Sequence, residues 1–318
     1  MFCAVRKCSI HFIGHHLVIV IELAVYIVQH RTKDDFNMAN IKMEAAIIYE
    51  SSLPDALRRA LIYAGDDGFV ASLPQLLHAR AIASYDNIIW NTWFTSNSEE
   101  CVVTTAQGNR VMVAVHGGGI FAKPERFQRL YFANQARSSA EGFTGDYAGK
   151  ISATEARDVL EGKLPDGSEF PVYTFDEFER GVADLPWRYG VILDFNLARK
   201  SKKGFQSFDV LKDEPNMIVR AGGVEAATAY LDKFRDRHNT KLMGNFHPFD
   251  HINPDQPQTR VPFLAGNKGG MGSEGDYNYG YDSEYGIGGY ACMLNMARYV
   301  AVAPRDASTS VRDLDFEL

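Results

Sequence analysis

The sequence predicts one compact domain of the mixed α/β class, with helices and strands combined in the α+β manner over residues 38–318. The chain has 318 residues, of which 46% are hydrophobic and 23% are charged. These values are ordinary for a globular protein with a core. Runs of β-branched residues alternate with segments whose apolar residues have helical spacing. No internal repeat and no long linker divides the sequence, which favours a single domain.

The clearest β signal lies at residues 101–116. Two runs in this segment, Cys101–Thr105 and Arg110–Val115, are rich in β-branched residues, which favour strands. Between them, Ala106-Gln107-Gly108-Asn109 has the composition of a tight turn. The segment therefore predicts a β-hairpin.

Helices are predicted by apolar spacing and by capping residues. Ser152 with Glu155, and Thr174 with Glu177, have the spacing of a capping box, in which side chain and backbone cap each other. The predicted helices cover residues 55–64, 73–83, 124–137, 152–160, 174–182 and 224–237.

A βαβ unit is predicted for residues 217–246. Met217–Arg220 and Leu242–Phe246 read as strands on either side of the helix at 224–237. Strands joined in this way are normally parallel with a right-handed crossover. A long C-terminal loop rich in glycine and tyrosine is expected after this unit, from Gly266 to Tyr290.

Residues 1–37 differ from the rest of the chain. Residues 9–29 are mostly apolar and long enough for a membrane span of about 20 residues, but three histidines and Glu22 interrupt them. We consider three alternatives: a membrane anchor through residues 9–29, a packed helix, or a translation start at Met38 that would make residues 1–37 a mis-called leader. We prefer the last, which predicts a cytoplasmic protein. The alternative is a membrane-anchored protein, and a membrane is an expected partner only if this segment is retained.

Charge and cysteine usage narrow the function classes. The net charge of −7 argues against nucleic acid as a partner, because nucleic-acid binding needs a basic face. After residue 37 the cysteines are Cys101 and Cys292, which indicates a reducing compartment rather than a disulfide scaffold. We expect both thiols to be buried and inert.

The densest group of candidate metal ligands and catalytic residues is His247, Asp250 and His251. Histidine and carboxylate together suit Zn²⁺ or Mn²⁺, and a bound metal would lower the pKa of a water molecule and create a hydrolytic nucleophile. His116 is a candidate further metal ligand if the end of its strand lies beside residue 246. The first functional prediction is therefore a metal-assisted hydrolase with a site at residues 247–251. The alternative reading is a turn held by hydrogen bonds between these side chains and the backbone.

Two short motifs resemble parts of known enzymes, but each is incomplete. Asp250-His251-Ile252-Asn253-Pro254 resembles the opening of the HNH endonuclease motif, but no histidine follows His251 to complete it. His116-Gly117-Gly118-Gly119 resembles the oxyanion-hole segment of esterases of the α/β-hydrolase class, but no serine has the Gly-x-Ser-x-Gly environment that such enzymes need.

Two glycine groups, Gly117-Gly118-Gly119 and Gly222-Gly223, precede predicted helices. They allow either close backbone packing or free N–H groups that bind an anion. A small-molecule or phosphorylated substrate is therefore a predicted partner.

The second functional prediction rests on the tyrosine-rich loop at residues 276–290. This loop holds five of the fifteen tyrosines of the chain, and tyrosine combines apolar area with a hydroxyl at low entropic cost. Tyr281 and Tyr285 are the candidate ligand-binding residues. This loop predicts a non-catalytic binding or assembly protein that uses it as an interaction surface, with its oligomeric state left open.

Overall fold

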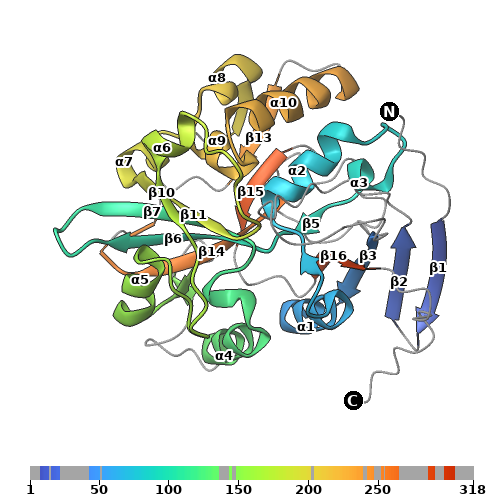
Figure 1. Ribbon diagram of the computed structural model, residues 1–318, viewed down its shortest axis with the longest axis horizontal. Coiled ribbons are helices and arrows are strands. Elements are labelled where there is room, and N and C mark those ends of the chain that lie inside the picture. The colour runs from blue at the N-terminus through green and yellow to red at the C-terminus, as the bar shows by residue number, and fades with distance from the viewer. Residues whose placement is uncertain are drawn as a thin grey trace.

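Two β-sheets with helices packed against them form the described part of the protein, shown as a computed structural model in Figure 1. Helices and strands combine within one compact domain, so the predicted α+β class is confirmed. The structure describes residues 8–13, 16–21, 43–50, 52–135, 143–144, 148–201, 204–238, 242–246, 252–253, 255–264, 286–290 and 297–304.

The smaller sheet joins distant parts of the chain. Its strands run in the order β1 (Cys8–Ile13), β2 (His16–Ile21), β3 (Met43–Glu50), β16 (Ala297–Pro304) and β4 (Phe69–Val70). Neighbouring strands are antiparallel, and β3 pairs with β16 along its full length, from Met43 opposite Pro304 to Glu50 opposite Ala297.

The larger sheet carries the candidate site residue His116, at the end of β7 (Arg110–His116). Its strands run in the order β10 (Val172–Thr174), β11 (Tyr189–Asp194), β7 (Arg110–His116), β6 (Ser98–Thr104), β14 (Gln258–Leu264), β15 (Gly286–Tyr290), β13 (Leu242–Phe246) and β12 (Gly204–Ser207). In addition, β5 (Phe94–Thr95) and β9 (Ala148–Lys150) pair with β14, and β8 (Phe143–Thr144) pairs with β9. The pairs β10–β11 and β13–β15 are parallel, and the others are antiparallel.

Helices cover both faces of the larger sheet. In Figure 1, α2 and α8–α10 lie on the upper side of the view, and α1, α4 and α5 lie on the lower side. The helices are α1 (Leu53–Ala64), α2 (Leu73–Ile82), α3 (Ile88–Asn91), the 3₁₀ helix η1 (Ile120–Ala122), α4 (Pro124–Gln135), α5 (Ala153–Leu160), α6 (Phe175–Glu179), α7 (Phe195–Arg199), α8 (Phe208–Lys212), α9 (Pro215–Ala221) and α10 (Val224–His238).

Buried hydrophobic side chains explain why the central strands are apolar on both faces. On β6, Cys101 and Val103 enter a cluster shared with α1, α4 and α5. Val102, between them, enters a second cluster shared with α6, α7 and α9. Alternate residues of a strand point to opposite faces, so a sheet covered on both sides reads as a continuous apolar run. A third cluster, which includes Trp90 and Tyr230, fills the space around α2 and α10.

The predicted hairpin and most of the predicted helices are confirmed. β6 and β7 pair antiparallel from Ser98 to Thr104, and Gly108 in their turn has φ 84°. Both capping boxes form, at Ser152 and at Thr174. The helix after Thr174 ends at Glu179, earlier than predicted.

The predicted βαβ unit is wrong. Residues 217–220, expected to form a strand, lie in α9, which has Pro215 in its first turn and ends at Gly222 in the left-handed conformation. Residues Asn216–Ala221 are all buried, and a short, fully buried apolar run has no periodicity that separates strand from helix. The strand predicted at 242–246 is β13, which pairs antiparallel with β12 and parallel with β15.

The C-terminal loop differs in part from its predicted form, and part of residues 9–29 is described, whereas the start at Met38 stays a prediction. The last residues of the predicted C-terminal loop, 286–290, form β15 between β14 and β13. Within residues 9–29, the described parts belong to β1 and β2, which pair with each other and with β3. Among the described helices, none combines the length and the apolar character that crossing a membrane requires.

Candidate functional site

The predicted catalytic residues His247, Asp250 and His251 lie outside the residues that the structure describes, as do Tyr281 and Tyr285. The described strands that precede and follow these residues in the chain, β13, β14 and β15, belong to the larger sheet. β13 ends at Phe246, opposite Gly288 of β15.

His116 at the end of β7 is buried, with 1% of its surface exposed. Its Nδ1 lies 2.9 Å from Ser98 Oγ, and its Nε2 lies 3.1 Å from the carbonyl oxygen of Val219. The Val219 carbonyl can only accept, so the His116 Nε2–H donates to it, and Nδ1 of the neutral ring accepts the Ser98 hydroxyl. Ser98 Oγ in turn accepts the Leu73 N–H. Burial lowers the pKa of His116 to about 4, which keeps the ring neutral. Both nitrogens are engaged, so His116 would have to lose one of these bonds to hold a metal.

The glycines after His116 form a tight turn between β7 and η1. Gly117 and Gly118 have φ values of 84° and 99°, and both N–H groups donate to the carbonyl oxygen of Asn97, at 3.1 and 2.9 Å. A Cβ atom on Gly119 would lie 2.6 Å from the carboxyl carbon of Glu99. The glycines therefore allow close packing. The amides of Gly117 and Gly118 could bind an anion only if they lost their hydrogen bonds to the Asn97 carbonyl oxygen.

The second glycine group ends α9. Gly222 adopts the left-handed conformation, and its N–H points to the carbonyl oxygens of Ile218 and Val219. The Gly223 N–H also donates to Ile218, at 2.9 Å. This arrangement is a glycine C-cap. The amide N–H groups that were predicted to bind a phosphorylated ligand donate to carbonyl oxygens of α9 instead.

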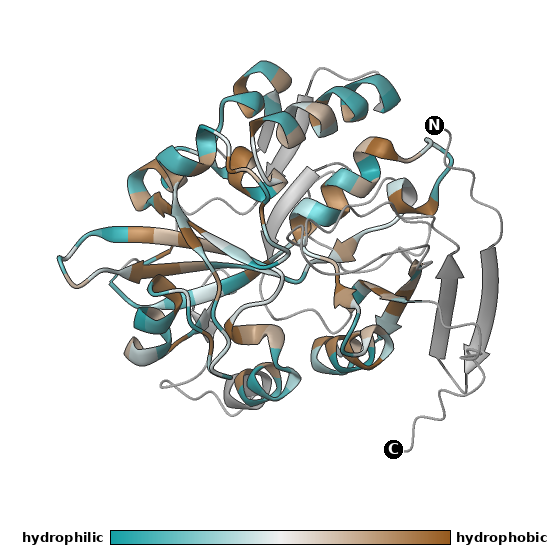
Figure 2. Ribbon diagram, viewed as in Figure 1, coloured by the Kyte–Doolittle hydropathy of each residue, from teal (hydrophilic) through white to brown (hydrophobic). Residues whose placement is uncertain are grey.

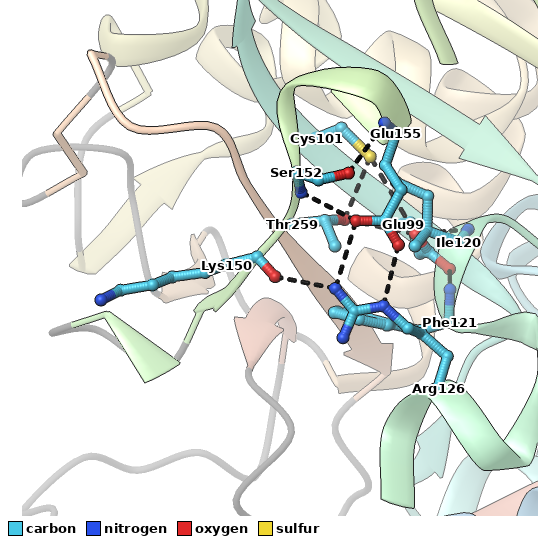
Figure 3. A network of polar contacts seen from close by, with 9 residues as sticks. All are labelled: Glu99, Cys101, Ile120, Phe121, Arg126, Lys150, Ser152, Glu155 and Thr259. Atoms are coloured by element: carbon cyan, nitrogen blue, oxygen red, sulfur yellow. Dashed lines mark hydrogen bonds and ion pairs between the residues drawn. The ribbon is translucent and has the colours of Figure 1, made fainter. Parts of the chain in front are cut away.

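The turn after Gly119 does bind an anion, which is the buried Glu99 carboxylate of the same chain (Figure 3). The N–H of Ile120 donates to Glu99 Oε2 at 3.0 Å, and the N–H of Phe121 donates to Oε1 at 2.5 Å. The hydroxyl of Thr259 on β14 donates to Oε2 at 3.3 Å. Burial raises the pKa of Glu99 to about 7, although these donors and the charge of Arg126 oppose the rise. Glu99 thereby ties η1 to β14.

The neighbours of Glu99 are also engaged (Figure 3). Cys101 is fully buried, and its Sγ lies 3.1 Å from Thr259 Oγ1. Burial raises the pKa of the Cys101 thiol, which keeps it protonated and agrees with the inert role predicted for it. Arg126 on α4 pairs with Glu155 on α5, with 2.9 Å between Nε and Oε1. This pair joins the two helices beside the Glu99 carboxylate.

The next residue, Glu100, points to the opposite face of β6 and forms a buried ion network. Its Oε1 lies 2.6 Å from Arg220 Nε on α9, and its Oε2 lies 2.9 Å from Arg260 Nε on β14. The three side chains are between 1% and 5% exposed. Burial alone would raise the pKa of Glu100, but the two arginines outweigh it and hold the pKa at about 2. The network fixes β14 to β6 and α9.

The end of β14 is held by β5 and β15. Both the N–H and the hydroxyl of Ser96 donate to the carbonyl oxygen of Pro262, at 3.3 and 2.6 Å. Leu264 lies opposite Phe94 of β5 and opposite Ile287 of β15. We call the strands β5, β14 and β15 the loop base, because residues 265–285 of the chain leave β14 and return to β15.

Among the residues that the structure describes, no group of three or more His, Cys, Asp and Glu side chains has an arrangement that could hold a metal ion. The three predicted metal ligands at 247–251 lie outside the described residues, so this statement does not cover them.

Comparison with known proteins identifies the class of fold. The chain is similar to a solved structure described as "Accommodation of massive sequence variation in Nanoarchaeota by the C-type lectin fold". The match has a TM-score of 0.56 and 23% sequence identity, and it covers 85% of this chain and 100% of the other. The likeness shows the C-type lectin fold. No family model matches the sequence, and no curated protein matches it.

The sequence reasoning missed the two acidic residues of β6. Glu99 and Glu100 are adjacent and directly precede the apolar run at Cys101, yet both are 2% exposed. Charged residues are almost never buried without partners. Two adjacent carboxylates at the start of a strand buried on both faces could have indicated ion networks on both sides of the sheet.

Proposed function

We propose that this chain is a non-catalytic binding protein with the C-type lectin fold, and that the tyrosine-rich segment 276–290 supplies its recognition surface. The observation that carries this proposal is the pairing of β14 with β15, in which Leu264 lies opposite Ile287. A segment of some twenty residues therefore leaves and rejoins the sheet at neighbouring positions. Loops held by a rigid scaffold in this way often carry binding function.

The rigidity of the loop base supports the proposal. β14 is fixed by Thr259 to Glu99, by Arg260 to Glu100 and by the carbonyl of Pro262 to Ser96. Because these contacts are buried and are made by residues outside 265–285, we expect the sequence of that segment to tolerate change without loss of the scaffold. The fold of the similar solved protein is described as accommodating massive sequence variation. That description favours a constant scaffold that carries a surface of variable sequence.

The composition of the segment suits recognition of a partner. Its tyrosines alternate with small and acidic residues, including Asp276, Asp282 and Glu284. Tyrosine rings supply contact area at low entropic cost, and the polar neighbours supply hydrogen bonds. Tyr281 and Tyr285, predicted from the sequence to bind the ligand, lie within this segment.

Tyrosine nitration followed by mass spectrometry tests whether the segment is a surface. Tyr277, Tyr279, Tyr281 and Tyr285 should react with tetranitromethane in the folded protein. Tyr230 and Tyr299, which are 0% and 1% exposed, provide internal controls and should react only after unfolding. Equal protection of the loop tyrosines and these buried controls would remove the basis of the proposal.

A variant with serine at positions 277, 279, 281 and 285 tests binding. It should unfold at the same urea concentration as the wild type, because the described core contains none of these side chains. On glycan and peptide arrays, the wild type should bind ligands that the variant does not. A variant that unfolds earlier, or that keeps the same array binding, would contradict a recognition role.

The metal-assisted hydrolase stays a prediction from the sequence. Elemental analysis of protein purified without added metal should find near-stoichiometric zinc or manganese if His247, Asp250 and His251 bind one. The His247→Ala and His251→Ala variants should then lose the metal. Unchanged metal content in both variants would exclude the site.

A further inference from the structure

The C-terminal end of α2 and the last turns of α10 form a surface that the function proposed above does not use. It consists of Ile82, Tyr85, Lys233 and Arg237, which we call the α2/α10 patch. Ile82 is 55% exposed and Tyr85 is 39% exposed, while Lys233 and Arg237 are partly exposed. The two cations are four residues apart, so they lie on one face of α10. Figure 2 shows the hydrophilic outer turns of α10 near the hydrophobic end of α2.

The cations of the patch are held against aromatic rings. Lys233 Nζ lies 4.4 Å from the centroid of the Tyr85 ring. The Arg237 guanidinium lies 5.8 Å from the same ring centroid and 5.2 Å from that of the buried Trp90, and it donates a hydrogen bond to the carbonyl oxygen of Tyr85. Both distances to Tyr85 are within the range of cation–π attraction. The positive charges are therefore positioned before any partner arrives.

A third cation lies behind the patch. Arg80 is 1% exposed, and its Nε and Nη2 donate to the carbonyl oxygens of Ile89 and Thr92, both at 2.9 Å. Its guanidinium lies 5.6 Å from the centroid of the Trp90 ring. Burial lowers the pKa of Arg80, and the charge of Arg237 adds to this effect. Among the ion pairs of the described residues, none joins Arg80 or Lys233 to a carboxylate.

The acidic side chains of α10 have other partners. Asp232 pairs with Lys212 at 2.8 Å and with Arg235 at 3.1 Å, and Asp236 lies 3.5 Å from Arg235. Asp86, next to Tyr85 in the chain, accepts a hydrogen bond from Ser84. The Asp86 carboxylate is exposed and keeps its charge, so the positive charge of the α2/α10 patch is that of the closely spaced Lys233 and Arg237.

We propose that the α2/α10 patch is a docking surface for an acidic peptide segment of a partner protein. A carboxylate of the peptide lies between Lys233 and Arg237, and an apolar side chain packs on Ile82 and Tyr85. Charge complementarity favours an acidic partner, and the exposed Ile82 and Tyr85 favour a peptide over a free anion. Tyrosine and arginine are also the residues enriched in the energetically dominant positions of protein interfaces.

The number of cations argues against an anionic membrane as the occupant. Recognition of anionic lipids usually uses clusters of about four to eight Lys and Arg residues. The patch exposes only Lys233 and Arg237, which matches one or two carboxylates of a peptide.

Fluorescence anisotropy with a fluorescein-labelled peptide that alternates Glu with Leu and Phe tests the proposal on the full chain. The Lys233→Glu/Arg237→Glu variant should bind the peptide at least about tenfold more weakly than the wild type, because two attractive charges become repulsive. Arg235→Glu is the matched control: it reverses a charge on the same helix but at the side that carries Asp232 and Asp236, and it should retain most of the affinity.

A second variant keeps the test decisive if the charge reversals disturb folding. Ile82→Ser changes an exposed side chain, should leave the circular dichroism spectrum and the thermal midpoint unchanged, and should weaken peptide binding severalfold. Three outcomes would overturn the proposal: no peptide binding by the wild type, equal weakening by Arg235→Glu, or binding to phosphatidylserine vesicles without binding to the peptide.

Discussion

Replacement of Glu100 by glutamine should be among the most destabilising single changes in this protein. Glu100 is 2% exposed and lies within hydrogen-bond distance of two arginines that are themselves 5% and 1% exposed. Glutamine has nearly the same shape but no charge, so Arg220 and Arg260 would lose the buried carboxylate that both of them contact. Breaking a buried pair on one side costs about 3–5 kcal/mol.

That loss is large relative to the free energy of unfolding of a typical domain, about 5–15 kcal/mol. Urea unfolding with linear extrapolation measures it. Glu125→Gln is the matched control, because Glu125 is 71% exposed and lies 3.8 Å from Arg58. The control should change the free energy of unfolding by less than about 0.5 kcal/mol.

A triple variant separates the loss of charge balance from the loss of packing. When Glu100→Gln is combined with Arg220→Met and Arg260→Met, the two arginine charges are removed together with the carboxylate that they contact, and part of the stability should return. If Glu100→Gln alone costs no more than Glu125→Gln, or if the triple variant is less stable than Glu100→Gln, the reasoning about the buried network is refuted.

The pH dependence gives a second measurement on the same residue. The pKa of Glu100 is about 2 in the folded protein, against an ordinary value of 4.5 for glutamate. A depressed pKa contributes stability that is fully present above about pH 4.5 and is lost as the pH falls towards 2. Below pH 4.5, wild-type stability should therefore decline more steeply than that of Glu100→Gln.

Three further predictions concern the turn after β7. Gly119→Ala should destabilise the protein by about 1–3 kcal/mol, measured by urea unfolding, because the added Cβ would lie 2.6 Å from the Glu99 carboxyl carbon; an unchanged midpoint would contradict the close packing. Glu99 has a folded pKa of about 7, above the ordinary glutamate value of 4.5, so its contribution to stability is fully present below pH 4.5 and is lost as the pH rises through 7. This decline should be absent in Glu99→Gln, and an identical pH profile in both proteins would show that Glu99 does not titrate in this range. The ring of His116, with a pKa of about 4, should show no change in its NMR chemical shifts between pH 5.5 and 8, whereas a midpoint near 6.5 would mean that the ring is exposed.

Much of the fold could be predicted because local patterns and tertiary structure agree in it. The hairpin at 101–116 combines β-branched runs with a glycine turn. Each capping box, at Ser152 and at Thr174, pairs residues that are three positions apart in the chain. The prediction failed at 217–220, where an apolar run in a short helix is buried on all sides and so lacks the polar face that indicates a helix. The local signals of the helix are at its ends, where Pro215 lies in the first turn and Gly222 follows the last residue.

The candidate site was less predictable than the fold. The sequence placed His116 and the glycine turn at the end of a strand correctly but gave no sign that Ser98 and Val219 occupy both nitrogens of His116. Val219 is far from His116 in the chain, and its carbonyl is brought there by the path of α9. Glu99 was missed for a similar reason, since its donors come from η1 and β14.

The position of β16 has a consequence for how the chain folds during synthesis. β16 lies between β3 and β4 in the smaller sheet. These two strands therefore gain the strand that pairs with both of them only after residues 297–304 leave the ribosome. Pairing across such a sequence separation is slow, because the closure entropy of a long loop must be overcome first. Until then, the pairing edge of β3 stays available to other chains. Truncations that remove β16 should therefore aggregate during expression, even though most of the larger sheet is already encoded before them.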